Sequence, residues 1–587
     1  MHGAGSGVDP TSSPTFRSYL SADWAQWMSE YPETATVFGV PGHNDRWTDE
    51  SPEGWAARDR HLASSLSRLR AIDPESLSSP DRLSYDLYRD GLESAVAGLA
   101  FGDDPLPFRS VVPRNRWIPL NQLEGVQIFA PEILDLQPLE TASDLAAYLA
   151  RLDSLGTCID QQVALLKAGL AKGYSPPRIA VRGAPDQIGG LLTADPTESP
   201  LLRPLAKLSD GIPPGERSAG LERARSTFAE SIAPAFVRLR EYLEREYLPA
   251  CRESISAASL PDGDVAYRFR VRWQTTTDLT PEAIHAVGLA EIARIRAEME
   301  AVAKSTGFEG PLTEFNERLK HDPRFCFSRA EELIDAYRAI AKRIDPALPR
   351  LFGVLPRLPY GVLPVPDFRA RSSPAAYYQP GAPTAGRPGY FFANTYDLTA
   401  RPRWEMEALA LHESVPGHHL QIALGQEDPS VPEFRRFAQY NAFVEGWGLY
   451  AESLGEELGM YADPYSKFGQ LTFEMWRSIR LVVDTGMHAL GWSRERAIEF
   501  FRRHTGKSDL DIGVEVDRYI VWPGQALAYK IGQLKIRELR TLAETTLGER
   551  FDVRAFHDRL LGAGALPLDL LERRVREWLG AASSARS

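Results

Sequence analysis

The residues with the clearest potential for chemistry lie in the segment LHESVPGHHLQ, residues 411–421. Three of the eleven histidines of the chain, His412, His418 and His419, fall within this segment, and Glu413 directly follows the first of them. Histidines on one segment with an adjacent glutamate are typical of sites in which imidazoles bind zinc and the glutamate activates water. The segment therefore predicts a zinc site, with another divalent metal as the alternative.

The spacing of these histidines differs from the usual zinc motif on a helix, in which the second histidine comes four residues after the first. A straight helix turns about 100° and rises about 1.5 Å per residue. On such a helix His419 would share a face with His412 but lie about 10 Å away along the axis, and His418 would point elsewhere. Because proline interrupts a helix and glycine permits unusual dihedrals, Pro416 and Gly417 predict a kink that returns one of these two histidines to His412. The spacing does not decide between them.

A third ligand is expected from another segment, and a carboxylate is a common partner of two histidines in hydrolytic zinc sites. Residues 441–459 form a mostly apolar helical pattern in which Glu445 stands close to Phe443, Val444 and Trp447. A buried carboxylate costs several kcal/mol unless it is paired or bound to metal. Glu445 is thus the predicted third ligand, and Glu452, on nearly the same face, is the alternative ligand or a supporting group.

Several stretches resemble the bacterial domain-of-unknown-function 885 family. That family is similar to zinc peptidases of the angiotensin-converting-enzyme, thimet-oligopeptidase and thermostable-carboxypeptidase type. The resemblance implies a zinc-dependent peptidase with metal ligands at His412, His418 and Glu445 and a general base at Glu413. His419 is the alternative ligand, because His-Leu-Gln resembles the His-Ile-Gln of the converting-enzyme type. The matching stretches are residues 32–36, 284–289, 389–397, HESVPGHHLQ, VEGWGLYAE and RYIVWPGQALAYKIG.

Other side chains are candidates for binding the substrate. By resemblance, Tyr529 is expected to stabilise the oxyanion, with Tyr519 as the second candidate. Arg480 is expected to pair with Asp484, four residues on in the same helix, or to receive a substrate carboxylate. Residues 389–395, which include Asn394, predict a strand that either holds an extended substrate or forms a structural hairpin.

Composition limits the class of protein. The 587 residues contain 67 Lys and Arg against 79 Asp and Glu, which gives a net charge of −12 and argues against a nucleic-acid partner. Three widely spaced cysteines exclude a disulfide framework. No uninterrupted apolar run reaches the ~18 residues of a membrane-spanning helix. Residues 1–13 lack the pattern of a secretory signal and are expected to be a disordered leader, so a cytoplasmic location is expected.

Helical spacing dominates the chain, for example over residues 142–171, 217–247, 281–305 and 328–344. A Pro/Gly-rich region with aromatic extended segments interrupts it at residues 348–400. We therefore expect a largely helical lobe at 14–347, short strands at 348–400, a helical catalytic region with the metal site at 401–580, and a tail at 581–587. The predicted fold is mainly α, a two-lobed metallopeptidase-like body with a deep central cleft and a short β-sheet on one wall.

The function expected is zinc-dependent hydrolysis of amide bonds in short peptides or peptide-like small molecules, with Glu413 as general base. Two alternatives stay open: a non-catalytic binding protein on the same scaffold, and an ester or amide hydrolase of small-molecule metabolism. Two histidines and one carboxylate can also hold iron for oxygen chemistry, but the adjacent Glu413 favours hydrolysis. Neither nucleic acid nor a membrane is expected as a partner, and the sequence leaves the oligomeric state open.

Overall fold

The computed structural model describes residues 12–104, 106–108, 112–366, 370, 373–383 and 386–584. The described chain is mainly helical and contains a small three-stranded sheet, as the sequence predicts. Most of the expected leader (1–13) lies outside the described residues, but Ser12 and Ser13 already belong to the first helix. Of the expected tail (581–587), residues 581–584 continue the last helix and the rest lies outside the described residues. None of the described helices is long and apolar enough to cross a membrane.

The chain divides into two compact units. The first contains residues 1–108, 113–255 and 259–263, and the second contains 109–112, 256–258 and 264–587. The division thus falls near residue 260, earlier than the boundary expected at 347. The reason is that helix α13 (Pro281–Ser305) packs closely along α21 (Pro464–His488). Gly288 permits this approach, because a Cβ atom there would lie 2.7 Å from Val482 Cγ2.

The first unit is built from helices joined by short turns. The predicted helix at 142–171 forms with these bounds, and Thr141 caps it by accepting a hydrogen bond from the backbone N–H of Asp144. The predicted helix at 217–247 forms as α9, α10 and two π-helical turns. The helices of this unit are α1 (Ser12–Glu30), α2 (Pro32–Phe38), α3 (Pro52–Arg70), α4 (Ser79–Gly98), α5 (Val126–Leu136), α6 (Ala142–Ala171), α7 (Arg178–Val181), α8 (Ala184–Gly189), α9 (Pro214–Thr227), α10 (Ala233–Tyr242) and α11 (Leu248–Ala250).

The second unit contains the predicted site residues. Its α13 has the predicted bounds, with Pro281 in the first turn and Thr280 accepting a hydrogen bond from the N–H of Ala283. The other helices are α12 (Gly263–Thr275), α14 (Leu312–His321), α15 (Ala330–Ile344), α17 (Met406–Glu413), α18 (His418–Glu427), α19 (Glu433–Phe437), α20 (Asn441–Ser453), α21, α22 (Arg494–His504), α23 (Asp509–Val521), α24 (Ala528–Leu547), α25 (Val553–Leu561) and α26 (Leu568–Ser584).

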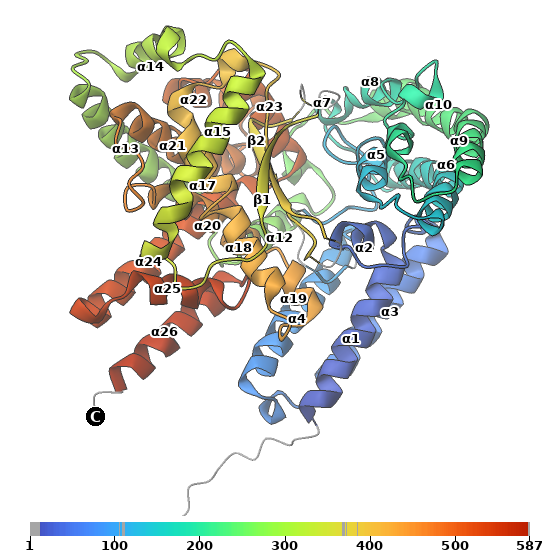
Figure 1. Cartoon of the computed structure of the whole chain (residues 1–587), viewed down its shortest axis with the longest axis horizontal. Helices are drawn as coiled ribbons and strands as arrows, with labels where there is room; N and C mark the ends of the chain where they lie inside the picture. Colours follow the sequence, from blue (N-terminus) through green and yellow to red (C-terminus); the bar gives the residue numbers. More distant parts are fainter. Residues whose placement is uncertain are drawn as a thin grey trace, which may run out of the picture. The chain divides into compact units, whose positions relative to one another are not determined.

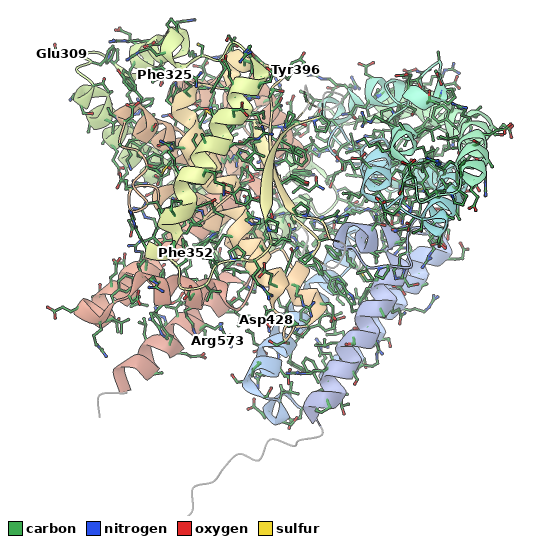
Figure 2. All side chains as sticks on the ribbon, viewed as in Figure 1. Glu309, Phe325, Phe352, Tyr396, Asp428 and Arg573 are labelled. Atoms are coloured by element: carbon green, nitrogen blue, oxygen red, sulfur yellow. The ribbon has the colours of Figure 1, made fainter. Side chains whose placement is uncertain are left out.

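Helix α21 is the central element of the second unit. Its side chains are buried from Phe468 to the end of the helix, and α13, α17 and α24 pack against it (Figure 1). A second cluster of the core surrounds Phe352, which is 1% exposed and is labelled in Figure 2. The ring centroid of Phe352 lies 4.9 Å from that of His557 and 6.2 Å from that of Trp447 on α20. Aromatic packing of Phe352 against Trp447 therefore helps to fix α20, the helix that carries Glu445.

The sheet lies within residues 348–400, as predicted, and its order is β1–β3–β2. Strand β1 (Tyr360–Pro364) runs parallel to β3 (Gly389–Ala393), and β2 (Ala376–Gln379) runs antiparallel to it. The sheet packs on α15 and α17 (Figure 1). Because β3 is the central strand, its backbone groups are paired on both sides. Strand β3 therefore offers no open edge to an extended substrate, and its antiparallel pairing with β2 is that of a structural hairpin.

Candidate metal centre

The two histidines are brought together by an interruption between α17 and α18. Helix α17 ends at Glu413 and α18 begins at His418, so the predicted kink is present. Gly417 is required there, because a Cβ atom on it would lie 2.0 Å from the carbonyl oxygen of His412. The indole N–H of Trp447 donates to the carbonyl oxygen of Pro416 at 2.8 Å and holds the connecting segment against α20.

His412, His418 and Glu445 converge on one point. One ligand atom from each of the three residues lies within 4.8 Å of the other two. The Oε2 atom of Glu445 lies 3.6 Å from Nε2 of His412 and 3.4 Å from Nε2 of His418. Ligand atoms bound at 2.0–2.1 Å to a tetrahedral zinc ion are ~3.4 Å apart. The donor set and its spacing therefore fit zinc.

A buried oxygen without a hydrogen-bond partner also indicates that a metal ion belongs at this position. Glu445 Oε2, the oxygen that lies near both imidazoles, is buried and has no hydrogen-bond partner within the described chain. Burial alone would raise the pKa of Glu445, but the two imidazoles beside it outweigh burial and hold that pKa well below its usual range. Burial would likewise lower the pKa of His412, yet Glu445 and Glu452 raise it to about 9. Glu445 is thus ionised between the two imidazoles, which is the form that can bind a cation.

Glu452 orients the first histidine. The Nδ1–H of His412 donates to Glu452 Oε1 at 2.8 Å, and Arg477 Nη2 lies 3.3 Å from the same oxygen. A carboxylate that holds the far nitrogen of a metal-binding imidazole fixes both the tautomer and the ring orientation. Of the two roles that the sequence leaves open for Glu452, the geometry selects the supporting one.

His419 is occupied elsewhere, which resolves the choice between the two histidines. Its Nε2–H donates to the carbonyl oxygen of Leu358 at 3.0 Å, and its Nδ1 accepts from the hydroxyl of Tyr378 at 2.9 Å. Burial lowers the pKa of His419 to about 4, in keeping with a neutral ring. His419 therefore ties α18 to the sheet, and His418 is the histidine beside His412.

Glu413, the predicted general base, lies at the end of α17 next to His412. It is 7% exposed, and its carboxylate makes no hydrogen bond or ion pair with any residue that the structure describes. The neighbouring acids Glu445 and Glu452, by contrast, both face basic side chains. Glu413 is therefore a mostly buried carboxylate without a hydrogen-bond or ion-pair partner among the described residues.

Small residues set the distance between the helices around the centre. A Cβ atom on Gly532 of α24 would lie 1.7 Å from the carbonyl oxygen of Ala442, and one on Gly446 would lie 2.5 Å from Gly532 Cα. The helices that carry Glu445 and Tyr529 thus cross with their backbones in contact. Sequence reasoning missed these positions, although the glycines of VEGWG and YKIG were visible as a signal.

Gly448 gives a direct test of the geometry. A Cβ atom there would lie 2.7 Å from Cε1 and 2.9 Å from Nε2 of His412. We expect Gly448→Ala to displace this imidazole and to lower zinc affinity ~10–100-fold, as changes around a metal ligand typically do. Competition with a chromogenic chelator measures the change. Gly425→Ala is the matched control, because Gly425 lies on α18 and a Cβ atom there would come no closer than 3.8 Å to its nearest neighbour, Gly564 Cα. Equal affinity in the two variants would contradict this packing.

Tyr529 lies beside the centre. Its ring is stacked on that of His412 at a centroid distance of 6.4 Å, and Arg480 Cζ lies 4.5 Å from the Tyr529 ring centre. The only contact of its hydroxyl within the described chain is a long one of 3.5 Å from Gln525 Nε2. The phenol therefore has a donor available for a ligand at the centre.

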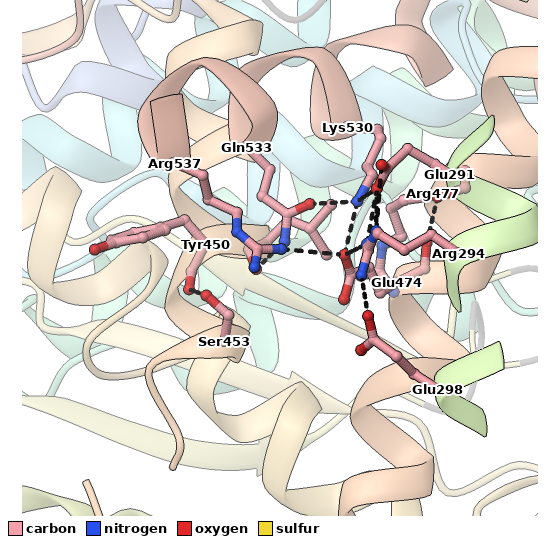
Figure 3. Close-up of polar contacts among 12 residues, drawn as sticks. Glu291, Arg294, Glu298, Tyr450, Ser453, Glu474, Arg477, Lys530, Gln533 and Arg537 are labelled. Atoms are coloured by element: carbon pink, nitrogen blue, oxygen red, sulfur yellow. Dashed lines mark hydrogen bonds and ion pairs between the residues drawn. The ribbon is translucent and has the colours of Figure 1, made fainter. Parts of the chain in front are cut away.

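The residue after Tyr529 anchors it through a buried charge network, shown in Figure 3. Lys530 is 0% exposed, and its Nζ donates to Glu474 at 2.7 Å and to Gln533 at 2.7 Å and lies 2.8 Å from Glu291. Arg294 on α13 also donates to Glu474, at 2.5 Å. Glu474 is thus shared by cations from two other helices. The network joins α13, α21 and α24 around the position of Tyr529.

Two of the other predicted substrate contacts are in different surroundings from those expected. Arg480 does not pair with Asp484: it donates to Glu515 and to the hydroxyl of Tyr519, both at 2.9 Å. Asp484 instead accepts from Tyr267, and burial raises its pKa to about 7. Side chains four apart can meet on a helix, but partners from other helices are closer here. Tyr519 is 1% exposed and also donates to Glu515, so it positions Arg480.

Asn394 is not brought to the centre by any contact in the structure. Its amide Nδ2 donates to the carbonyl oxygens of Ala370, Ser373 and Pro374, and its Oδ1 accepts from the N–H of Tyr396. These bonds tie the segment after β3 to the segment that precedes β2. We therefore assign Asn394 a structural role in place of the expected contact with substrate.

Comparisons with known proteins place the chain. A search of curated proteins found no match. A solved structure described as "the putative lipoprotein from Colwellia psychrerythraea" is 28% identical, with a TM-score of 0.87 over 97% of this chain and 99% of that one. A second, described as "a putative lipoprotein of unknown function from Shewanella oneidensis", is 17% identical, with a TM-score of 0.68 over 95% of this chain and 99% of that one, and shares the fold. Residues 32–575 match a family described as bacterial protein of unknown function (DUF885), and the chain belongs to that family.

Proposed function

We propose that the protein is a zinc-dependent hydrolase that cleaves amide bonds of short peptides or peptide-like molecules. The observation that carries this proposal is the meeting of His412 Nε2, His418 Nε2 and Glu445 Oε2, together with the mostly buried carboxylate of Glu413, the residue that directly follows His412. Three protein ligands leave a coordination position open, which is typical of catalytic zinc sites, whereas structural sites are closed by four. The deep cleft expected around these residues stays part of the proposal.

In this proposal each residue around the metal position has a separate role in hydrolysis. Zinc, when bound, supplies the Lewis acidity that activates water and polarises a carbonyl. Glu413 accepts a proton from the attacking water and returns it to the leaving amine. Tyr529 donates its free hydroxyl proton as a hydrogen bond to the oxygen on which charge develops. Glu452 holds the ring of His412 in one orientation during these steps.

Metal content and metal-dependent turnover test the proposal together. Protein purified without chelator should contain about one equivalent of zinc, or take it up, because the ligands are already assembled. It should hydrolyse members of a panel of tri- and tetrapeptides, lose this activity with a chelator and regain it with zinc. Less than about half an equivalent, with no gain on adding zinc, would favour the non-catalytic alternative. Zinc binding without hydrolysis of any peptide, amide or ester would leave a metal protein that is not a hydrolase.

A cytoplasmic location is a separate prediction. Because the similar protein of Colwellia psychrerythraea is described as a lipoprotein, the test has to compare cytoplasmic and membrane fractions of cells that produce the full-length protein. Recovery in the membrane fraction would replace this prediction.

A further inference from the structure

A second group of charged side chains includes Arg480, which, like His412, contacts the ring of Tyr529. Arg480 on α21 and Arg518 on α23 approach the same atom, Glu515 Oε2, at 2.9 Å and 3.7 Å. Arg480 Cζ lies 4.5 Å from the ring centre of Tyr529, and Arg518 Cζ lies 5.7 Å from that of Tyr519. We name Arg480 and Arg518 the arginine pair. Two aromatic rings and one carboxylate thus surround two guanidinium groups.

The arginine pair carries more charge than its surroundings neutralise. Glu515 is the single acid in contact with it within the described residues, and its distance to Arg518 is long for an ion pair. Tyr519 stays neutral, because burial raises the pKa of its phenol far above the usual value. The nearby Asp484 is engaged by Tyr267 and the N–H of Gly524 and makes no ion pair with either arginine. Beyond Glu515, Arg518 has the more distant charge of Asp484 and a side chain that is 20% exposed. The side chain of Arg480 is 7% exposed, so a charge there is costly without a full set of partners.

Donors are left over as well as charge. Nη1 of Arg480 and both Nε and Nη2 of Arg518 are buried and have no acceptor in the described chain. Arg480 is 6% exposed as a whole residue. Buried polar groups are satisfied in the great majority of cases, and an exception commonly marks a missing ion or ligand. Here the three unsatisfied nitrogen donors belong to two guanidinium groups that share the carboxylate of Glu515. The group that would satisfy them is an anion with several acceptor oxygens.

We propose that the arginine pair binds the free C-terminal carboxylate of the peptide that is cleaved at the metal centre. This inference rests on the proposed function and narrows its substrates to short peptides with an unblocked C-terminus. A guanidinium fork matches a carboxylate in shape and in charge.

The distances limit the length of the released piece. From the ring of His412 to that of Tyr529 is 6.4 Å, and from there to Arg480 Cζ is 4.5 Å. The ring centre of His412 and Arg480 Cζ are therefore at most about 11 Å apart, which is the span of roughly three extended residues at ~3.3–3.6 Å each. We accordingly expect a short released piece of about one to three residues. Tyr529 then stands between the two parts of the site and contacts both.

The test compares peptides that differ only at the C-terminus. N-acetylated tripeptides and tetrapeptides are assayed as free acids and as C-terminal amides with zinc-loaded enzyme. Charge-assisted hydrogen bonds contribute ~1.5–3 kcal/mol, so we expect kcat/KM to favour the acids by roughly 10–150-fold. In Arg518→Gln this acid-to-amide ratio should fall at least about tenfold, mainly through KM for the acids, and Arg518→Lys should restore part of it. Arg494→Gln is the matched control, because Arg494 pairs with Asp517 outside the arginine pair.

Several outcomes would overturn the inference. Equal kcat/KM for acids and amides in the unaltered enzyme would do so, as would an Arg518→Gln variant that keeps the full ratio. Stimulation of both substrates by chloride, without a preference for acids, would assign the arginine pair to an inorganic anion. If Arg518→Gln does not fold, the unaltered enzyme is tested for inhibition by product peptides as free acids and as amides. Stronger inhibition by the acids would support the inference, and equal inhibition would overturn it. If zinc binds but nothing is hydrolysed, the proposed function fails, and calorimetric binding of acid against amide peptides still decides this inference.

Discussion

Glu413→Gln should retain zinc and lose hydrolysis. Glutamine has nearly the same shape as glutamate but cannot accept a proton at neutral pH, so the change removes the base and leaves the three ligand side chains in place. General-base catalysis contributes ~10²–10⁴-fold, and we expect kcat to fall by at least that factor with KM nearly unchanged. Steady-state kinetics on a free-acid tripeptide, with zinc measured on the same samples, provides both numbers.

The position of Glu413 makes this prediction specific. It directly follows His412, a predicted metal ligand, is 7% exposed and has no partner in the described chain, so its replacement breaks no ion pair. Glu456→Gln is a suitable control, because that side chain is 61% exposed and lies in a surface pair with Lys467. Full turnover in Glu413→Gln would remove this residue from the mechanism. Loss of zinc in the same variant would give Glu413 a structural role in the site.

Lys530→Met should destabilise the protein by about 3–5 kcal/mol, the usual cost of removing one partner from a buried ion pair. Lys530 has no solvent exposure, and methionine cannot donate to the oxygens of Glu474, Glu291 and Gln533 that surround its ammonium group. The variant leaves Glu474 with Arg294 and Arg537 as charged partners and with the amide of Gln470 as a hydrogen-bond donor. Urea denaturation followed by circular dichroism measures the change in free energy of unfolding.

A matched lysine on the same helix provides the control. Lys535 is 22% exposed and pairs with Glu538 and Glu572 near the surface. Lys535→Met should therefore change the free energy of unfolding by less than about 1 kcal/mol, as is usual for surface pairs. If both lysine variants were equally stable, the network would not hold α24 in place.

The effect of Lys530→Met should depend on pH. Burial opposes ionisation of Glu474, but Lys530 and Arg294 outweigh it and lower its pKa to about 2. A carboxyl whose pKa is lowered on folding stabilises the folded state above its unfolded pKa, and that contribution is lost as pH falls toward the folded value. The difference between the unaltered protein and Lys530→Met should thus be full at pH 7 and smaller at pH 4. A difference that grows on acidification would contradict this assignment.

Local chemistry in the sequence selected the residues of the candidate site and predicted most of the helices. His412, Glu413 and Glu445 could be selected because metal binding and proton transfer require particular side chains, and a carboxylate in an apolar helix needs a partner. The helices at 142–171 and 281–305 could be bounded because their caps and apolar spacing lie within the helix itself. The kink at Pro416–Gly417 also followed from local backbone chemistry.

Tertiary structure alone decided which groups are in contact. It chose His418 over His419 because Leu358 and Tyr378, far away in the sequence, use both nitrogens of His419. It paired Arg480 with Glu515 on another helix and not with Asp484 on its own helix. Such a pairing depends on the angles at which helices pack, and the spacing of residues in the sequence does not reveal these angles. It also placed β3 between two other strands and gave Gly448 its contact with His412, since strand order and helix crossings arise only when distant segments meet.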